Sequence, residues 1–371
     1  MDSLVSLRRQ AVARSLFAPL PLAQAIDRLG FVQADPIRAP ARAQDLILRQ
    51  RVRGYREGDL ERRYPALELE EDVLHNYGFL PRRLQALLHP RRFDGQTRAE
   101  RHAEGLAEAV LDFVRRHGPT HPKALEAELG AQRYANYWGG QSKATTGLLD
   151  SLHYRGQLRV LRRDKGIRVY TLAEPAADRL DADERFARLA RLILDLYAPL
   201  PTASFRQLLG MLDYGVPQLS EQIGRRAETI ARWGEQGWLI AGRIDGEEWL
   251  WPHDETPADA APRGVRLLAP FDPVVWDRRR FEKLWGWRYR FEAYTPAPKR
   301  QLGYYALPLL YGDQVIGWAN LSATERLEAE IGLVATPPGG RGRFEAALGH
   351  ELEKMAQFLA LSGVDSIRWR E

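Results

Sequence analysis

Gln33 and Asp35 form the pair of polar side chains whose types and spacing most suggest chemistry in this 371-residue sequence. The apolar residues before Gln33, in GFVQADP, indicate a short strand, and residues i and i+2 of a strand point to the same face. A carboxamide and a carboxylate would then project together, and a carboxylate so placed can serve in acid–base catalysis. The pair is our first candidate for a catalytic site.

The stretch that follows this pair, IRAPARAQDLILRQRV, reads as an Arg-rich helix. Its basic residues are Arg38, Arg42, Arg49, Arg51 and Arg53. Arg38 and Arg42 would lie one helical turn apart and could clamp phosphates. A carboxylate beside such a surface is electrostatically costly, which indicates a functional reason for Asp35. The alternative is structural, since Asp before Pro36 is a common N-cap and first-turn pair, and spacing alone favours that alternative.

Other catalytic motifs are missing from the sequence. It contains no GxxxxGK phosphate loop, no GxGxxG and no GxSxG, and Lys354 stands where an HExxH motif starting at His350 would need its second His. The absence of Cys excludes disulfides, Cys-ligated zinc, iron–sulfur clusters and thiol nucleophiles. The sequence therefore predicts no cofactor and no metal, and it gives no support to nucleotide hydrolysis, zinc hydrolysis or serine esterase chemistry.

The charge balance is basic, with 54 Lys and Arg against 49 Asp and Glu, and only six of the basic residues are Lys. Arg suits bidentate contacts to phosphate, although a GC-rich genome would also enrich Arg. Basic residues gather in 38–63, in 153–168 and in 276–300, where Trp and Tyr residues are interleaved with them. Basic residues mixed with aromatics are typical of a nucleic-acid surface, whereas each cluster alone is typical of a solvated face.

The composition, with 44% hydrophobic residues, is that of a globular chain. No segment is apolar over the ~18–20 residues that a membrane helix needs. The Arg-rich start, MDSLVSLRRQAVARSLF, lacks the unbroken apolar run of a signal peptide. It predicts a first amphipathic helix, with a transit peptide as the alternative. We expect a cytoplasmic protein without a membrane partner.

A unit of helices followed by a two-stranded hairpin recurs along the chain. Near residue 150 a helical stretch leads through Gly156 into two alternating strands, LRVLR and IRVYTL. Near residue 230 another leads through Gly237 into strands joined by Asp245-Gly246, a strong hairpin signal. Two shorter helical stretches precede each hairpin, which is the order of a winged helix. A weaker third copy around Gly30 suggests an internal repeat.

We therefore predict a mixed α/β (α+β) fold of three tandem winged-helix units, a small C-terminal β-barrel-like domain and a terminal helix. The predicted domains are 1–96 with the Gln-x-Asp motif, 97–176, 182–256 and 262–371. Linkers rich in Ala, Pro and acids separate the last three. In the last domain YRFEAYTP, LGYYALPLLYG, QVIGWANLSA and ERLEAEIGLV read as strands, and RFEAALGHELEKMAQFLAL as the final helix.

The segment LGFVQADPIRAPARAQDLILRQRV resembles the winged-helix DNA glycosylases of the YcaQ/AlkX and AlkZ type. Their signature is Gln-apolar-Asp in the first branch and Gln-apolar-Gln in the second. GQLRVLRR and RVYTLAE are similar to the family's second winged helix, and the more specific stretch from FDPVVW to GYYALPLL is similar to its C-terminal β domain. The resemblance extends from about residue 5 to about residue 335.

The resemblance implies a monofunctional DNA glycosylase that excises N7-alkylguanine and unhooks alkylation interstrand crosslinks. Such a base is cationic and leaves readily, so the enzyme needs an anion that stabilises the oxocarbenium ion and positions a water. Asp35 would supply the anion, and Gln33 would hold the water or a sugar-phosphate oxygen. With this resemblance, a catalytic role for Asp35 is favoured over the purely structural role that spacing alone favours. No Lys lies nearby for a lyase step, so the product would be an intact abasic site, formed without metal or cofactor.

The partner implied is double-stranded DNA that carries alkylated or crosslinked guanine, with no obligate protein partner, and a bacterial protein of this kind would be nucleoid-associated. The expected DNA-binding residues are Arg38, Arg42, His75, Tyr289, Arg290, Lys299 and Arg300. For His75 a local hydrogen bond in a partly buried site is an equal alternative, because the family's His-Glu is His-Asn here. Trp318 and Asn320 depart from the family's Gly-Arg-x-Asp, which could remove an ion pair or a DNA contact, or change lesion preference.

Two other functions stay open at this point. A non-enzymatic winged-helix DNA-binding protein, such as a transcription regulator, would share the basic clusters but would not need a carboxylate that projects toward DNA. A nuclease would need several carboxylates around a metal, and Asp45 is the partner that the sequence offers to Asp35, on a different predicted element.

Overall fold

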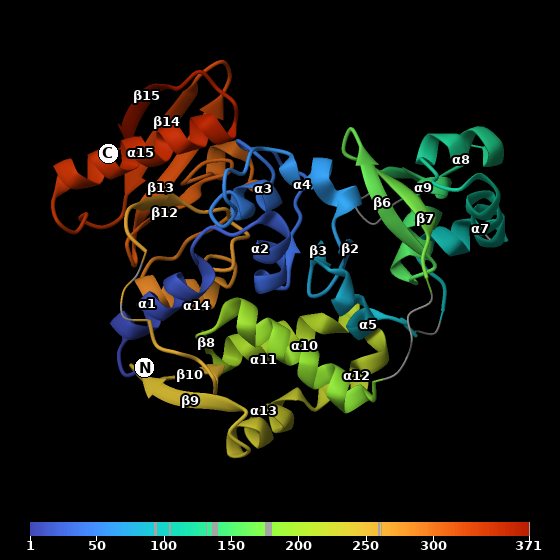
Figure 1. Cartoon of the computed structure of the whole chain (residues 1–371), viewed down its shortest axis with the longest axis horizontal. Coiled ribbons are helices and arrows are strands. Elements are labelled where there is room, and N and C mark those ends of the chain that lie inside the picture. The colour runs from blue at the N-terminus through green and yellow to red at the C-terminus, as the bar shows by residue number, and fades with distance from the viewer. Residues whose placement is uncertain are drawn as a thin grey trace. The chain divides into compact units, whose positions relative to one another are not determined.

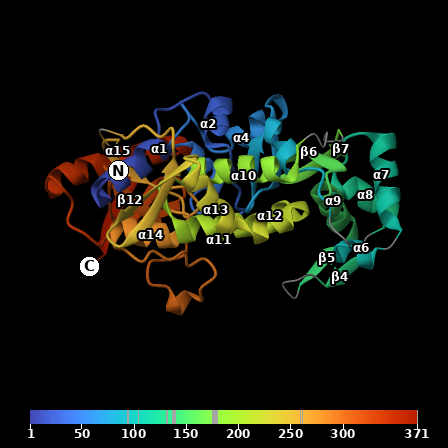
Figure 2. The same cartoon turned by 90° about the horizontal axis from the view of Figure 1, so that it is seen from below.

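The computed structural model describes residues 1–92, 95–103, 105–130, 132–135, 140–174, 180–258, 260 and 262–370. The chain divides into two compact units, and Figures 1 and 2 label many of their helices and strands. The first unit comprises residues 1–60, 190–210 and 225–371, and the second comprises 61–189 and 211–224. The division into four domains stays a prediction, and its boundary at residue 176 lies outside the described residues.

The N-terminal part of the first unit consists of helices α1 and α2, the short strand β1 and helix α3. Their bounds are Leu4–Ser15, Leu22–Leu29, Val32–Gln33 and Ala43–Leu48. The helices are labelled in Figure 1. Gly30 ends α2 in the left-handed conformation, with φ of 73°, and a Cβ there would lie 2.2 Å from Leu192 Cδ1. The helix–Gly–strand junction predicted at Gly30 is therefore present, and it leads into the strand that carries Gln33.

The long Arg-rich helix predicted after Pro36 is wrong. The backbone stays non-helical up to Arg42, and α3 has only six residues. Pro36 and Pro40 explain the difference, because the residue before a proline is disfavoured in the helical conformation. Arg38 and Arg42 are consequently not one helical turn apart, and Asp35 is not the N-cap of a helix.

The second predicted hairpin also lies in the first unit and is confirmed. Helix α13, Arg226–Glu235, is followed by β9, Leu239–Ile244, and β10, Glu247–Pro252. Gly237 leaves the helix with φ of 71°, and Asp245 and Gly246 form the turn with φ of 48° and 76°. Before it come α10, Ala182–Tyr197, β8, Leu200–Pro201, which pairs with β10, and α11, Thr202–Gly215.

The C-terminal part of the first unit is a five-stranded sheet with two helices. Its elements are β11 (Val265–Leu267), α14 (Arg278–Trp285), β12 (Leu307–Tyr311), β13 (Gln314–Ala323), β14 (Leu327–Leu333), α15 (Arg341–Phe358) and β15 (Val364–Arg370). The strands lie in sequence order, and only β14 and β15 pair parallel. Three predicted strands correspond to β12, β13 and β14. YRFEAYTP forms no strand, and β15 follows the helix predicted to be last, so these two expectations are wrong.

Helix α1 shares one hydrophobic core with the C-terminal sheet. The core consists of Val12, Leu16, Leu268, Val274, Val275, Phe281, Tyr289, Ala306, Leu310, Val315 and Trp318. Trp318, where the family pattern has Arg, fills this core with its ring, and the guanidinium carbon of Arg370 lies 5.3 Å from the centroid of that ring. The unit that carries Gln33 and Asp35 is thus built from both ends of the chain.

The second unit contains the other predicted hairpin and one that was not expected. Its elements are α4 (Asp59–Arg63), β2 (Leu69–Val73), β3 (Tyr77–Pro81), α5 (Gln85–Leu88), α6 (Arg98–His102), α7 (Leu106–His117), α8 (Pro122–Leu129), β4 (Arg133–Ala135), β5 (Gln141–Lys143), α9 (Ala144–Tyr154), β6 (Leu158–Asp164), β7 (Ile167–Leu172) and α12 (Ser220–Gly224). Lys165 and Gly166 form the turn between β6 and β7 with φ of 52° and 83°, so that hairpin is confirmed. The hairpin of β2 and β3 has no apolar–polar alternation that would predict it.

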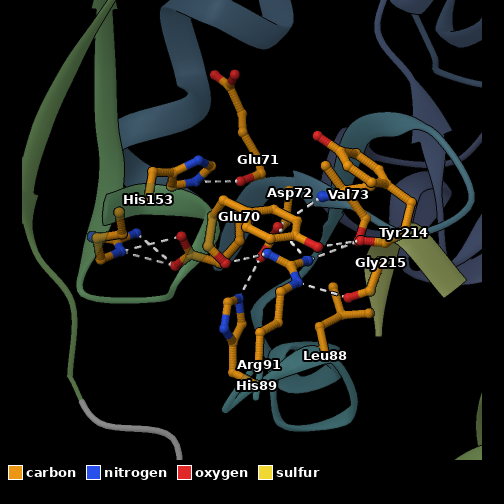
Figure 3. Close-up of polar contacts among 12 residues, drawn as sticks. Glu70, Glu71, Asp72, Val73, Leu88, His89, Arg91, His153, Tyr214 and Gly215 are labelled. Atoms are coloured by element: carbon orange, nitrogen blue, oxygen red, sulfur yellow. Dashed lines mark hydrogen bonds and ion pairs between the residues drawn. The ribbon is translucent and has the colours of Figure 1, made fainter. Parts of the chain in front are cut away.

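Strand β2 owes its unusual pattern to three consecutive buried acids, Glu70, Glu71 and Asp72. Arg159 pairs with Glu70 at 2.7 Å, and Arg163 pairs with Glu71 at 2.5 Å. Arg91 Nη2 donates to Asp72 Oδ1 at 2.8 Å, and His89 Nε2 lies 2.7 Å from Oδ2, as Figure 3 shows. The acids of one strand therefore neutralise guanidinium groups from several parts of the unit.

The basic cluster 153–168 is consequently not an open cationic surface. Besides the two pairs above, Arg155 donates to Glu100 at 2.6 Å, and Arg168 donates to Asp150 at 2.8 Å. Because these charges are matched by carboxylates of the same unit, the nucleic-acid surface predicted for this cluster does not fit the structure.

Candidate active site

Asp35 lies just after strand β1, in the non-helical segment that leads to α3. Its backbone N–H donates to Gln44 Oε1 at 3.3 Å, and its Oδ1 accepts from the backbone N–H of Ile37 at 2.9 Å. The second bond closes an Asx-type turn across Pro36 and sets the direction of the carboxylate. Asp35 and Gln33 each keep 9% of their surface exposed, which leaves narrow access to both side chains.

The carboxylate of Asp35 has no cationic partner among the residues that the structure describes. Burial raises the pKa of Asp35 above its ordinary value, and the hydrogen bond from Ile37 opposes that rise. No Arg or Lys among the described residues lowers the pKa, and Oδ2 accepts no hydrogen bond from them. A partly buried carboxylate without a counter-ion destabilises a fold. It suits a site where positive charge develops on a ligand.

Gln33 is held by Trp276. The indole Nε1 of Trp276 donates to Gln33 Oε1 at 2.6 Å. Because the oxygen of the amide accepts this bond, Nε2 is the end left to donate, and no described residue accepts from it. The ring of Trp276 lies 5.6 Å from that of Tyr197, measured between centroids. An amide held in this way can donate to a water or to a phosphate oxygen.

A buried ion pair fixes the loop before Trp276. Arg51 donates from its two terminal nitrogens to the two carboxylate oxygens of Asp272 at 2.8 and 2.9 Å, and both side chains are 0% exposed. Arg51 also donates to the carbonyl of Ser15 at 2.8 Å. The pair joins the segment after α3 to the FDP motif, and so sets Trp276 against Gln33. The place of Arg51 in the Arg-rich stretch suggested a phosphate-binding surface. The buried ion pair with Asp272 instead gives Arg51 a structural role.

Aromatic side chains line the approach to Asp35. Burial and then the charge of Asp35 raise the pKa of both Tyr294 and Tyr305, so the carboxylate lies near both rings. Tyr294 is 80% exposed. Tyr305 is buried, and its hydroxyl has no hydrogen-bond partner among the described residues. Phe291 packs edge-on against both, with centroids 6.0 and 5.2 Å apart.

The exposed Tyr294 belongs to a loop, residues 292–303, that is closed by Glu292. The Glu292 carboxylate accepts the backbone N–H groups of residues 301–303 at 2.7–3.2 Å. Asn320 anchors the end of the loop by donating to the carbonyl of Leu302 at 2.7 Å. This loop is part of the orange segment between α14 and β12 in Figure 2. The Asn at position 320, where the family pattern has Asp, therefore positions a loop beside the candidate site.

The predicted DNA-binding residues of the C-terminal part divide into two groups. Arg290 and Lys299 are exposed, and Arg300 is half-buried in the loop just described. Tyr289 is buried in the hydrophobic core, and its hydroxyl donates to the carbonyl of Ala306 at 2.8 Å. The prediction of a DNA contact for Tyr289 is therefore wrong, because the periodicity of a strand was assumed for a segment that forms none.

The remaining predicted DNA-binding residues lie in different units. In the first unit, the side chain of Arg38 is 59% exposed and lies 3.8 Å from Glu57, and Arg42 is half-buried at the start of α3. In the second unit, His75 is buried in the turn between β2 and β3, and burial lowers its pKa to about 3. A neutral, buried His fits the local structural alternative and not a phosphate contact.

Asp45 does not complete a metal site with Asp35. Its Oδ1 accepts from the hydroxyl of Tyr55 at 2.7 Å and from the N–H of Gly58 at 3.0 Å. Within the described ranges, no three His, Asp or Glu gather as ligands for a metal ion. The same ranges contain no helix that is long and apolar enough to cross a membrane.

Sequence reasoning does not find Trp276, Tyr305 and Gln44 as members of the site. Trp276 lies 243 positions from Gln33, and its one signal is the aromatic enrichment of a basic cluster. Tyr305 reads as part of a strand, and Gln44 as one polar residue of a helix. Only the folded chain brings these side chains to the Gln33–Asp35 segment.

The chain matches a family model and a solved structure. A family model described as DNA glycosylase AlkZ-like matches residues 26–358. Among solved structures, the DNA glycosylase AlkZ of Streptomyces sahachiroi superposes with a TM-score of 0.63 at 16% sequence identity, and the alignment covers 100% of both chains. The second match indicates the same fold over the whole length.

Proposed function

Because the chain belongs to the AlkZ-like DNA glycosylase family, we propose that it removes N7-alkylguanine from double-stranded DNA and unhooks alkylation interstrand crosslinks. The family gives the general activity, which is hydrolysis of the bond between a base and deoxyribose.

The observation that carries the proposal is the unpaired carboxylate of Asp35 among aromatic rings. N7-alkylguanine is cationic, and positive charge moves onto C1′ of the sugar as the base departs. A carboxylate without a competing cation can stabilise that charge throughout the reaction. The exposed ring of Tyr294 offers a π-face to a cationic base, which aromatic rings attract.

The step follows from the chemistry of these groups. Water adds to C1′ and gives its proton to Asp35, while the bond from C1′ to N9 breaks and its electron pair leaves with the base. The base departs neutral, so it needs no general acid. Gln33, whose amide nitrogen is free to donate, holds the water or a neighbouring phosphate oxygen.

An intact abasic site is the product, because a lyase step needs an amine. The segment that carries Gln33 and Asp35 contains no Lys, and Lys299 of the loop 292–303 is assigned to the DNA backbone. The reaction also proceeds without a metal, since the anion and the donor that it needs are supplied by side chains. Arg38, Arg42, Arg290, Lys299 and Arg300 are the proposed contacts to the DNA backbone.

A single-turnover assay on a duplex with one N7-methylguanine, in EDTA, tests the proposal. Wild type is expected to release the base and leave an alkali-labile site. Asp35→Asn is expected to lose roughly 100-fold or more in rate, the scale of an acid–base group. Asp112→Asn, which changes an exposed carboxylate of the second unit, is the matched control and is expected to act like wild type. A parallel duplex with a guanine–guanine alkyl crosslink tests unhooking.

Two outcomes would contradict the proposal. Equal rates for wild type and Asp35→Asn would remove Asp35 from the reaction. Tight duplex binding with no release by either protein would favour a DNA-binding protein without chemistry, such as a transcription regulator. If the wild-type rate in EDTA rises when excess Mg²⁺ is added, only the metal independence of the proposed reaction is contradicted.

A further inference from the structure

A strongly basic cavity of about 640 Å³ lies in the first unit, away from the residues assigned above. It is lined by the segment after α3, by the start of β11 and by α15. The basic residues on its wall include Arg49, Arg53, Arg56, Arg263, Arg266 and Lys354. Glu351 is the one acidic residue that lines it. The cavity therefore carries a large excess of positive charge.

Glu351 cannot neutralise this charge, because its carboxylate is already occupied. Its Oε1 accepts from Arg49 Nη1 at 2.9 Å, from Gln50 Nε2 at 3.1 Å and from the backbone N–H of Leu267 at 3.1 Å. Arg53, Arg263 and Lys354 form no ion pair with any described residue, and all three are exposed. The cavity thus has one matched cation and several unmatched ones.

Arg266 adds a buried donor that lacks an acceptor. Its Nη1 donates to Gln50 Oε1 at 3.0 Å, but its Nε is buried without a hydrogen-bond partner among the described residues. Burial lowers the pKa of Arg266, and the charges of Arg51 and Arg49 lower it further against the opposing effect of Glu351. A guanidinium in this state destabilises the fold unless an anion is bound beside it.

We propose that this cavity binds phosphate groups. Guanidinium groups match the oxygens of a phosphate in geometry as well as in charge, and Lys adds a mobile point charge. Several unmatched cations around one space exceed what a single carboxylate would balance, and they suit a ligand with more than one negative charge. The shared chemistry is that of a phosphodiester chain or of a free polyphosphate.

The position of the cavity favours the DNA backbone, an argument that rests on the proposed function. Gln44 accepts from the N–H of Asp35, and Arg49 follows five residues later along the same helix and its final turn. Five helical residues span about 8 Å. Phosphates of one strand recur every ~3.4 Å along duplex DNA. A strand whose damaged base lies at Asp35 therefore has phosphates within a few nucleotides of the cavity.

The test is salt-dependent binding of an undamaged duplex, measured by fluorescence anisotropy with the full chain. Arg53→Ala/Lys354→Ala removes two exposed cations of the cavity. Arg341→Ala/Arg343→Ala removes two exposed cations from the start of the same helix, α15, and is the matched control. The cavity variant is expected to lower the slope of log Kd against log salt by about 1–2, as loss of one or two phosphate contacts predicts, and the control is expected to keep it.

A second arm separates the two sources of phosphate. Tripolyphosphate binding is measured by calorimetry on wild type and on the cavity variant. An unchanged duplex slope with tripolyphosphate binding that only the wild type shows would assign the cavity to a free ligand, and phosphate binding would stand. Unchanged slopes together with no difference in tripolyphosphate binding would overturn the proposal.

These readouts are independent of base release. Suppose that the wild type releases no N7-methylguanine but the cavity variant lowers the slope of log Kd against log salt. The phosphate site would then stand, and the proposed function would be rejected. If the wild type releases the base, and the cavity variant changes neither the salt slope nor tripolyphosphate binding, the proposed function stands and the phosphate site is rejected. Thermal melting of each variant shows whether it is folded, and the exposed positions of Arg53 and Lys354 make folding the expected result.

Discussion

Trp276 and Gln33 are joined by a hydrogen bond of 2.6 Å from the indole N–H to the amide oxygen. This contact decides what Gln33 can do, because it leaves the amide nitrogen as the free donor. It also makes the candidate site depend on the FDP loop, which Arg51 and Asp272 hold through a buried ion pair. Gln33 is therefore positioned by a residue 243 positions away in the sequence.

The contribution of this contact is measurable with a double-mutant cycle. Gln33→Ala and Trp276→Phe are each expected to lower the single-turnover rate, by roughly 10–100-fold for Gln33→Ala and less for Trp276→Phe. If Trp276 acts by orienting Gln33, the double variant is no slower than Gln33→Ala alone. Additive losses would instead give Trp276 a separate role, such as stacking on DNA.

The rate should depend on pH through Asp35. Its carboxylate acts in the ionised form, and its pKa is raised by burial, so the rate is expected to fall as pH drops toward that raised pKa. The rate profile from neutral to acidic pH should fall for wild type and stay flat for the residual activity of Asp35→Asn. Because a raised pKa means that ionised Asp35 destabilises the fold, the Asn variant should melt at the same temperature or higher. A sloping profile in Asp35→Asn would assign the titration to another group.

Removal of the buried hydroxyl of Tyr305 tests whether this group contributes to the reaction rate or only to packing. Tyr305→Phe removes a group without a protein partner, so stability should be unchanged or improved. If the hydroxyl holds the water or the substrate beside Asp35, the rate falls by about 10-fold. Tyr289→Phe is the matched control, since its hydroxyl donates to Ala306 and lies in the core; it should lose about 1 kcal/mol of unfolding free energy and no rate. An unchanged rate in Tyr305→Phe would leave that residue a purely structural role.

Removal of a buried acid of β2 is expected to lower the free energy of unfolding substantially. Burial alone would raise the pKa of Asp72, but the charge of Arg91 and the bond from His89 outweigh it and hold the pKa below its ordinary value. The stability that Asp72 contributes is thus present above about pH 4 and is lost as pH falls below it. Asp72→Asn should cost about 3–5 kcal/mol in urea unfolding at pH 7, because it leaves the buried Arg91 unpaired.

Asp112→Asn is the control for this substitution, since Asp112 pairs with Arg115 on the surface and should change stability by less than about 1 kcal/mol. A cost below 1 kcal/mol for Asp72→Asn as well would show that the network of Figure 3 contributes little. Hydrogen exchange would then be expected to show no loss of protection in β2.

Hairpins and helix ends were predictable because their signals are local. Gly156, Gly237 and the Asp245-Gly246 turn adopt positive φ, which glycine and turn residues permit, and periodicity of two marks the strands that follow. Helices α1, α2, α7, α8 and α15 were likewise predictable from their apolar spacing. The sequence also predicts Gln33 and Asp35 as neighbours, since two residues apart cannot be far from each other.

The errors share a different cause, which is long-range pairing. Strand β2 is buried on both faces, where guanidinium groups from elsewhere in the unit pair with its acids. Because three of its five residues are acidic, its hydrophobic pattern does not predict a buried strand. Arg51 looks like a DNA contact until Asp272, 221 positions later, is seen beside it. Charge along the sequence does not distinguish a solvated Arg from a paired one, and for the same reason it could not reveal the basic cavity.

The core that α1 shares with the C-terminal sheet also sets an order of events during synthesis. Val12 leaves the ribosome about 300 residues before Trp318, with which it shares the core. At ~5–20 residues per second this interval is roughly 15–60 s. During that time the apolar face of α1 has no final partner, whereas every residue of the second unit has been made once residue 224 emerges. The unit that holds Gln33 and Asp35 is therefore the last to close on the growing chain.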